Sequence, residues 1–289
     1  NRRRRILVAL HDAASADVIL QRAFALARLD ESDVHVLGVV PTVHQVNPLF
    51  PQQHALQVQC ALDYVVAMTA ELRRKVTRLF PEWASERRVE VRTGTFVREV
   101  RDRVDGLRAD LVVMQPSVGC RGSDVTFLAN TTGVAILVAR SATSNESIVA
   151  ATDLRDGAYP VLNRAAALGS RLEAPVVAIH NVVHAPAMTT DPLGWALTLL
   201  SEAELREARR KHLEKSVRQT HASSSVLAHD IKTSSAILRQ ARALDADLVV
   251  VGTRRRSWLA RFFSTPVAVE VVDHARRSVL VVPISDQAA

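Results

Sequence analysis

The chain has 289 residues, about twice the length of a typical single domain, which favours two domains. Hydrophobic residues make up 48% of it and charged residues 23%, a composition that excludes an intrinsically disordered protein. The formal net charge of +7 is divided almost evenly between the two halves, so no nucleic-acid partner is expected. The one basic run, Arg2–Arg5, is either a solvated strand entrance or a contact for an anionic surface.

Cysteine and glycine are both scarce. Cys60 and Cys120 are too few for a disulfide framework or a self-contained zinc site, so no metal is expected. The chain has no apolar run long enough to cross a bilayer and begins without a signal-peptide pattern, which predicts a cytoplasmic protein with no membrane span. Ten glycines leave little material for loops that cradle phosphate.

Strands and helices alternate along the first half of the chain. Ile6–Leu10 is a continuous apolar run typical of a strand covered on both faces, and Ser15 can cap the helix that follows. A long segment carries apolar residues at helical spacing, among them Leu62 and Val66. Cys60 lies on the same apolar stripe and is therefore expected in the core. The other elements expected here are strands at Val34–Val40, Val89–Val91, Leu111–Met114 and Ala135–Ala139 and a helix over 97–107.

The second half repeats this order. Residues 108–114 read R-A-D-L-V-V-M and residues 245–251 read D-A-D-L-V-V-V, which indicates an internal repeat of about 140 residues. We therefore predict two copies of one unit, at residues 1–140 and 147–289, joined by a polar linker at 141–146. The expected strands of the second copy are Ile148–Thr152, Pro175–Val182, Val226–His229, Leu248–Val251 and Val279–Val282, with helices near Ala158–Arg171, Glu202–Arg218, Ser234–Leu244 and Val267–His274.

This alternation predicts an α/β fold with two tandem open, mostly parallel five-stranded sheets and helices on both faces of each. Ligands of such sheets lie beyond the carboxyl ends of the strands, where the strand order reverses. The residues that follow the first and fourth strands are therefore the candidates for a site. They are His11 and Gln115 in the first copy, and Asp153 and Gly252 in the second.

Familiar catalytic motifs are missing from the chain. It contains no P-loop, no dinucleotide-binding glycine motif, no nucleophile elbow and no zinc-protease helix. His180 and His184 leave a strand into a loop, so we assign them structural or solvated roles rather than metal binding. No catalytic residue is predicted, and an enzyme is not expected.

One region does suggest binding chemistry. Gly252, Thr253 and three arginines at 254–256 follow the fourth strand of the second copy. A turn between a strand and a helix presents free N–H groups, and neighbouring arginines favour an anion there. Asp153 borders the same crevice and can accept a hydrogen bond from an adenine amino group or a ribose hydroxyl. The alternative is a basic loop exposed to solvent.

The repeated unit resembles the universal stress protein family. The resemblance rests on D-L-V-V-V-G-T at 247–253 and H-A-x-x-S-V-L-V-V at 274–282, and it covers nearly the whole chain. It implies a tandem member with an adenine-nucleotide alpha hydrolase-like fold and a stress-linked role. In nucleotide-binding members, G-x-x-G-x9-G-[ST] holds the phosphates of ATP, while an Asp after strand one and the end of strand two hold the adenosine.

Carried over to the second copy, the family motif is incomplete. Arg255 and Thr265 stand where the second and third glycines belong, and Pro266 stands at the following Ser/Thr position. In the first copy, His11 replaces the Asp and Gln115 replaces the first glycine, which predicts no ATP binding of the family kind. The degenerate nucleotide crevice is expected at Asp153, Asn181, Gly252, Thr253, Arg255, Arg256 and Thr265.

The leading hypothesis is therefore a non-enzymatic cytoplasmic stress-response protein with a degenerate nucleotide site. One alternative is an ATP- or AMP-binding sensor, or slow ATPase, that uses the second copy. Another is a binder of a different small, lipid-like ligand, covered by the apolar segments Pro41–Pro51 and His184–Leu200. Without such a ligand, these segments are expected to be helices that pack over the sheet or between protomers.

The resemblance also implies a partner for each half. In the family the fifth strand mediates dimer contacts, so Ala135–Ala139 is expected to pair with Val279–Val282 in an intramolecular pseudo-dimer. A further homodimer and an unidentified protein partner remain open.

Overall fold

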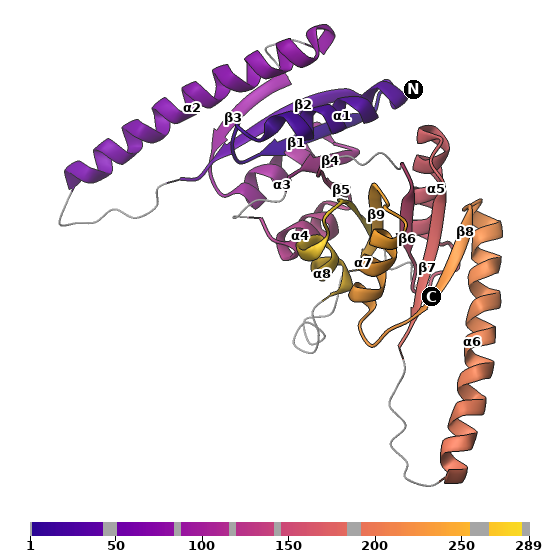
Figure 1. Cartoon of the computed structure of the whole chain (residues 1–289). Coiled ribbons are helices and arrows are strands. Elements are labelled where there is room, and N and C mark those ends of the chain that lie inside the picture. The colour runs from indigo at the N-terminus through magenta and orange to yellow at the C-terminus, as the bar shows by residue number, and fades with distance from the viewer. Residues whose placement is uncertain are drawn as a thin grey trace. The chain divides into compact units, whose positions relative to one another are not determined.

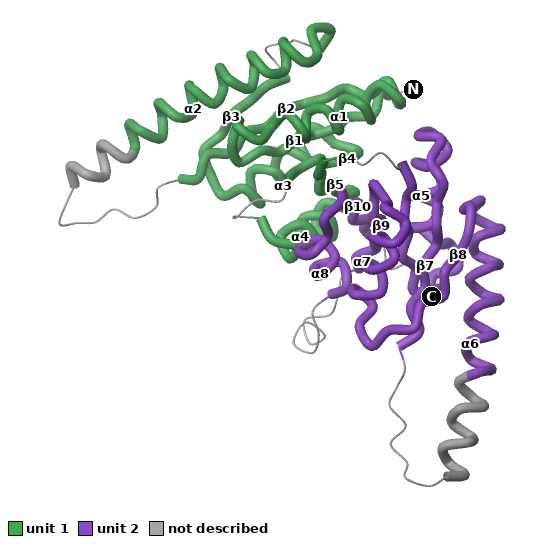
Figure 2. The backbone as a smooth tube through the Cα atoms, viewed as in Figure 1, with its two compact units in different colours: residues 1–141 green, residues 142–289 purple. Residues whose placement is uncertain are grey.

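The computed structural model describes most of the chain (Figure 1). The described residues are 2–42, 51–83, 88–115, 120–141, 146–183, 192–254 and 266–284, without the side chains of 51–57 and 192–202. Most of the predicted linker at 141–146 lies outside them. The chain divides into two compact units, residues 1–141 and 142–289, coloured separately in Figure 2.

The first unit is built on a parallel sheet whose strand order is β3-β2-β1-β4-β5. Every residue of β1 after Arg5 is buried, because helices cover both faces of the sheet. This burial accounts for the continuous apolar runs in the sequence. The strands are β1 (Arg5–Leu10), β2 (Asp33–Val40), β3 (Val89–Thr93), β4 (Leu111–Met114) and β5 (Ala135–Val138).

Four α-helices connect these strands, and α1 packs beside α2 while α3 packs beside α4. With right-handed crossovers, the first pair covers one face of the sheet and the second pair covers the other. The helices are α1 (Ala16–Asp30), α2 (Pro51–Leu79), α3 (Phe96–Leu107) and α4 (Gly122–Thr132), with a short 3-10 helix η1 (Pro81–Trp83) after α2.

The second unit repeats this topology with the order β8-β7-β6-β9-β10, and all its neighbouring strands are parallel. The prediction of open five-stranded α/β sheets is thus confirmed in each unit. Its strands are β6 (Ile148–Ala151), β7 (Val176–Val182), β8 (Ser224–His229), β9 (Leu248–Arg254) and β10 (Ser278–Ile284), and its helices are α5 (Pro160–Leu172), α6 (Pro192–Thr220), α7 (Thr233–Ala243) and α8 (Val267–His274).

Two expectations for the first unit were wrong in detail. Ser15 precedes α1, but its side chain makes no capping bond; its N–H and its hydroxyl both donate to Asp12 Oδ1, at 2.9 and 2.7 Å. Cys60 is exposed rather than part of the core, and Leu62 and Val66 on the same helix are 52% and 70% exposed. Helical spacing identified the helix, but contact with the sheet decides which stripe is buried, and that contact begins only near Met68.

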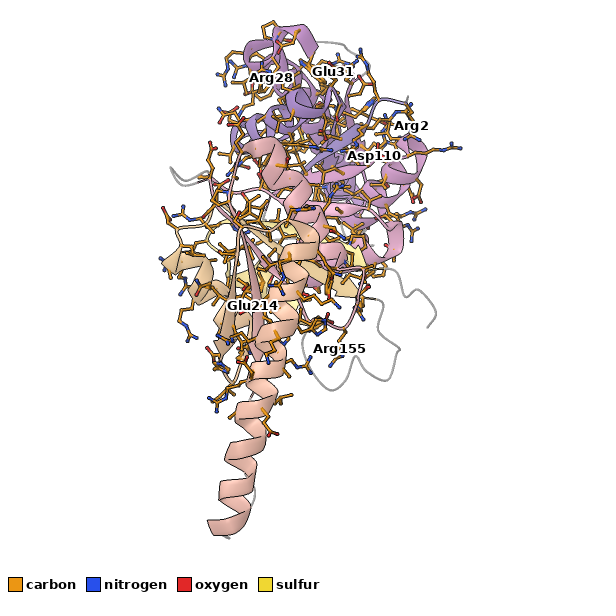
Figure 3. The ribbon with its side chains drawn as sticks, turned by 90° about the vertical axis from the view of Figure 1, so that its right-hand side faces the viewer. Arg2, Arg28, Glu31, Asp110, Arg155 and Glu214 are labelled. Atoms are coloured by element: carbon orange, nitrogen blue, oxygen red, sulfur yellow. The ribbon has the colours of Figure 1, made fainter. Side chains whose placement is uncertain are left out.

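The arginines at the start of the chain belong to the entrance of β1. The Arg2 side chain donates to the carbonyl of Arg108, and Arg4 forms an ion pair with Asp30 at 3.0 Å. The backbone N–H of Arg5 donates to Asp110 Oδ2 at 2.8 Å; Arg2 and Asp110 are labelled in Figure 3. These contacts favour the strand-entrance interpretation over a contact for an anionic surface. Among the described residues, no helix is long and apolar enough to span a membrane.

Candidate functional site

A crevice of about 690 Å³ opens at the carboxyl ends of β6, β7 and β9, where the strand order of the second unit reverses. This is the place at which open parallel sheets bind ligands. Its apolar lining includes Val161, Ile237 and Ile284. Its charged lining residues are Asp153, Arg155, Asp156, Arg209 and Arg254.

Asp153 lies just beyond β6, and its side chain is 49% exposed. Its Oδ1 accepts the backbone N–H of Arg155 at 3.1 Å, which fixes the carboxylate in the turn. Arg254 Nη2, from the end of β9, lies 3.7 Å from Asp153 Oδ2 and 4.0 Å from Asp156 Oδ2. The guanidinium of Arg254 therefore offsets the charge of both carboxylates within the crevice.

Asn181, at the end of β7, is buried and hydrogen-bonded inside the unit. Its Nδ2 donates to the carbonyl of Asp230 at 3.0 Å and to Thr233 Oγ1 at 3.1 Å. Its Oδ1 accepts the N–H of Asp230 at 2.9 Å. The side chain thus ties β7 to the turn before α7, and both of its amide hydrogens are used there.

Gly252 and Thr253 lie in β9, opposite Val282 and Pro283 of β10. The expectation that the strand ends at Val251 and a turn begins at Gly252 was wrong, because β9 continues to Arg254. A Cβ on Gly252 would lie 2.5 Å from Ile284 Cδ1 and 2.9 Å from Val161 Cγ2. The glycine therefore allows two apolar side chains to pack on the strand.

The remaining predicted site residues, Arg255, Arg256 and Thr265, lie outside the described residues. Pro266, which directly precedes α8, lines the crevice. Of the predicted set, the structure thus brings Asp153, Asn181, Gly252 and Thr253 to one crevice.

Tyr159, His180 and Arg209 were not placed in the site by sequence analysis, which gave His180 a structural or solvated role. His180 neighbours Asn181 on β7, so the two side chains point to opposite faces of the sheet. His180 Nδ1 lies 2.8 Å from the carbonyl of Thr152, and Tyr159 Oη lies 2.9 Å from His212 Nε2 on α6. The spacing of Arg209 and His212, three residues apart on one helix, was the signal available in the sequence.

The environment of His180 favours its neutral form. Burial lowers the pKa of its imidazole, and the positive charge of Arg209 and the neighbouring His212 lower it further. The carbonyl of Thr152 and the carboxylate of Asp153 act in the opposite direction without reversing the shift. Since a carbonyl only accepts, Nδ1 carries the hydrogen and Nε2 carries the lone pair.

At the corresponding position in the first unit, the described side chains contact one another. His11 stacks on Phe96 with ring centroids 3.7 Å apart. Gln115 Nε2 donates to Ser15 Oγ at 2.7 Å and to Asp12 Oδ2 at 3.2 Å. Burial opposes ionisation of Asp12, but bonds from Ser15, Gln115 and Ala14 outweigh it and lower the pKa of the carboxyl group.

Strand order and covering helices define each unit as an open, doubly wound α/β domain. The crevice at the carboxyl ends of its strands gives the second unit room for a ligand. Residues 144–283 match the model of the universal stress protein family. The second unit therefore matches the universal stress protein family over almost its whole length. No curated protein sequence matches the chain.

Solved structures of similar length share the fold of the whole chain. A functionally unknown protein from Pseudomonas aeruginosa is 18% identical, with 98% of this chain and 93% of that chain covered and a TM-score of 0.63. A universal stress protein from Archaeoglobus fulgidus is 12% identical, with 97% of both chains covered and a TM-score of 0.59. Another from Archaeoglobus fulgidus, solved in complex with dAMP, is 22% identical over 48% of this chain and 99% of that chain, with a TM-score of 0.33.

Proposed function

We propose that this chain is a tandem universal stress protein that serves a cytoplasmic stress response by binding a small ligand in its second unit, without catalysing a reaction. The observation that carries the proposal is the crevice of the second unit. The second has a crevice of about 690 Å³ at the switch point of its sheet. At the corresponding position in the first unit, His11 stacks on Phe96, and Ser15 is hydrogen-bonded to Asp12 and Gln115.

The chemistry of the crevice favours a degenerate nucleotide site. Gly252 lies in a strand and carries the packing of Ile284 and Val161 at the position where a phosphate would need close backbone approach. Asp153 faces the guanidinium of Arg254, which competes with any hydroxyl or amino group that a ligand would offer to this carboxylate. Both features argue against tight binding of ATP or AMP.

The test is a thermal-shift and calorimetric titration of the full chain with ATP and magnesium. We expect no shift of the midpoint at millimolar ATP and no hydrolysis of ATP. A ligand present at 100 times its dissociation constant would add about 2.7 kcal/mol of stability, so binding of useful affinity is easily detected. A clear shift with ATP or AMP would instead support the alternative of a nucleotide sensor, and phosphate release would support a slow ATPase.

A lipid-like ligand is the third candidate. The segments Pro41–Pro51 and His184–Leu200, expected to cover such a ligand, lie largely outside the described residues. Mass spectrometry of the purified protein after denaturation would identify a co-purified ligand of either kind.

We also infer an intramolecular pairing of the two units through their last strands. β5 and β10 each stand at the edge of their own unit's sheet, and both are apolar. An uncovered apolar edge strand is prone to aggregation. Pairing Ala135–Ala139 with Val279–Val282 would cover both of these edges.

Cleavage at an engineered protease site in the linker at 141–146 tests this pairing. We expect the two halves to elute together in size-exclusion chromatography at micromolar concentration, because the strand contacts persist after the covalent link is cut. Cleavage at the same site under denaturing conditions is the control. Separation of the halves under native conditions would disprove the pairing.

A further inference from the structure

The wall of the crevice next to α6 combines a buried imidazole with a guanidinium. His180 on β7 is 8% exposed, and Arg209 on α6 lines the same crevice. His180 donates its Nδ1 hydrogen to the carbonyl of Thr152 at 2.8 Å, so Nε2 is the ring atom left for a ligand. Nε2 has no hydrogen-bond partner within the described part of the chain.

The charges around this wall favour an anion. Three arginines and two aspartates line the crevice, which leaves one positive charge in excess. Arg254 is directed at both aspartates, with its Nη2 3.7 Å from Asp153 and 4.0 Å from Asp156. Arg155, labelled in Figure 3, lies on the exposed loop after β6. Arg209 has no ion pair with any described residue, so its charge is available to a ligand.

The groups that face His180 come from three elements. Arg209 and His212 lie on α6, Asp153 follows β6, and β8 places the apolar Leu227 opposite His180. Burial, Arg209 and His212 together hold the imidazole neutral in the empty crevice, against the opposing effect of Asp153. An acid group brought next to Nε2 adds a negative charge that favours the protonated ring.

We propose that His180 and Arg209 form an anion subsite of the crevice, in which the acid group of a ligand binds together with one proton taken up by His180 at Nε2. The proton comes from solvent, and the imidazolium then donates a hydrogen bond to the anion. Because Val161, Ile237 and Ile284 line the same crevice, the ligand class is an organic anion with an apolar body. The inference rests on the proposed function, since it needs the crevice to bind a ligand.

Linkage fixes the sign of the pH dependence. The His180 pKa is lowered from its ordinary value in the free protein and is higher in the complex, so affinity rises as pH falls between these two values. The rise is at most about tenfold per pH unit for one proton. A neutral ligand of the same shape gives no such rise.

The experiment uses the full chain and 1-anilinonaphthalene-8-sulfonate, whose sulfonate stays ionised throughout. Fluorescence titration at pH 8.0 and pH 6.0 should show binding that is about fivefold or more tighter at pH 6.0. Calorimetry in two buffers of different ionisation enthalpy should show uptake of about one proton. N-phenyl-1-naphthylamine, which has the same rings without the sulfonate, should bind with an affinity that changes less than about twofold.

Three variants separate the roles of the residues. His180→Gln keeps an amide N–H for the carbonyl of Thr152 but cannot titrate, so its affinity should lose the pH dependence and the proton uptake. Arg209→Gln should weaken binding of the sulfonate at both pH values and leave the neutral probe unaffected. Lys211→Gln is the matched control, because Lys211 is 73% exposed on the same helix and does not line the crevice.

Each outcome bears on one proposal. Circular dichroism and thermal melts first establish that the variants are folded; if His180→Gln does not fold, the proton uptake of the wild type and of Arg209→Gln decides. Sulfonate binding that is equal at both pH values, or unchanged in Arg209→Gln, overturns the anion subsite while the ligand crevice stands. Absence of binding of either probe at both pH values overturns the ligand crevice itself, and the subsite with it.

Discussion

Replacement of Phe24 by alanine is expected to lower the free energy of unfolding of the first unit by about 3–5 kcal/mol. Phe24 on α1 is 1% exposed and stacks on Phe80 with ring centroids 3.8 Å apart. It also meets the edge of the Trp83 ring at 5.3 Å. Truncation removes both aromatic contacts and leaves a cavity between α1 and the segment after α2, which rigid neighbours fill only in part.

Urea unfolding followed by hydrogen exchange and mass spectrometry measures this loss, because peptides of residues 1–141 report on the first unit separately. Leu29→Ala is the matched control: Leu29 lies on the same helix but is 45% exposed, so the change should stay within about 0.5 kcal/mol. A loss below about 1 kcal/mol for Phe24→Ala would mean that the stack of Phe24 on Phe80 contributes little to the stability of the first unit.

Replacement of Gly169 by alanine is expected to destabilise the second unit by about 1–2 kcal/mol, although alanine is the better helix former. A Cβ at this position in α5 would lie 2.4 Å from Val176 Cγ2 and 2.8 Å from the carbonyl oxygen of Ala174. The backbone carbonyl cannot rotate away as a side chain can. Relief therefore requires α5 to shift from the start of β7, and this cost exceeds the gain of about 1 kcal/mol in helix propensity.

The same substitution at Gly106 is the control with the opposite expected sign. Gly106 lies in α3, and a Cβ there would meet no atom within 4 Å. Gly106→Ala should therefore stabilise the first unit by about 0.5–1 kcal/mol. Urea unfolding of both variants beside the wild type measures the pair. A stabilised Gly169→Ala variant would contradict this prediction. It would show that α5 can move away from β7 at little cost in free energy.

Most of the fold could be predicted because the sequence patterns that indicate strands and helices involve residues close together in the chain. The runs of buried strands such as Leu111–Met114 and Ile148–Ala151 are apolar on both faces, and this pattern is visible without any knowledge of neighbours. Helix α4 was missed because G-S-D-V-T-F-L-A-N-T-T is rich in weak helix formers. A local capping bond and burial stabilise it: Asp124 accepts the N–H of Arg121 at 2.9 Å, and Leu128 is fully buried in the tertiary structure.

The place of the candidate site in the sheet could be predicted from the sequence, but the full set of residues that line it could not. Parallel topology alone brings residues after β6 and β9 to one edge, and so Asp153 and Gly252 were correctly expected near each other. His180 and Arg209 were missed because they come from a strand and a helix 29 residues apart, and no short motif connects them. The direction of the Arg254 side chain toward Asp153 likewise depends on the extension of β9, which local apolarity did not indicate.

The sequence by itself determined the repeated α/β unit, the open parallel sheets and the departures of the phosphate motif at Arg255, Thr265 and Pro266. These follow from periodicity and from residue identity, which are properties of neighbouring positions. The tertiary structure alone decided that His11 stacks on Phe96 at the switch point of the first unit and that a crevice opens at the switch point of the second. The reason is that such a stack or crevice depends on where side chains from distant segments meet, and burial and hydrogen bonding settle this only once the chain has folded.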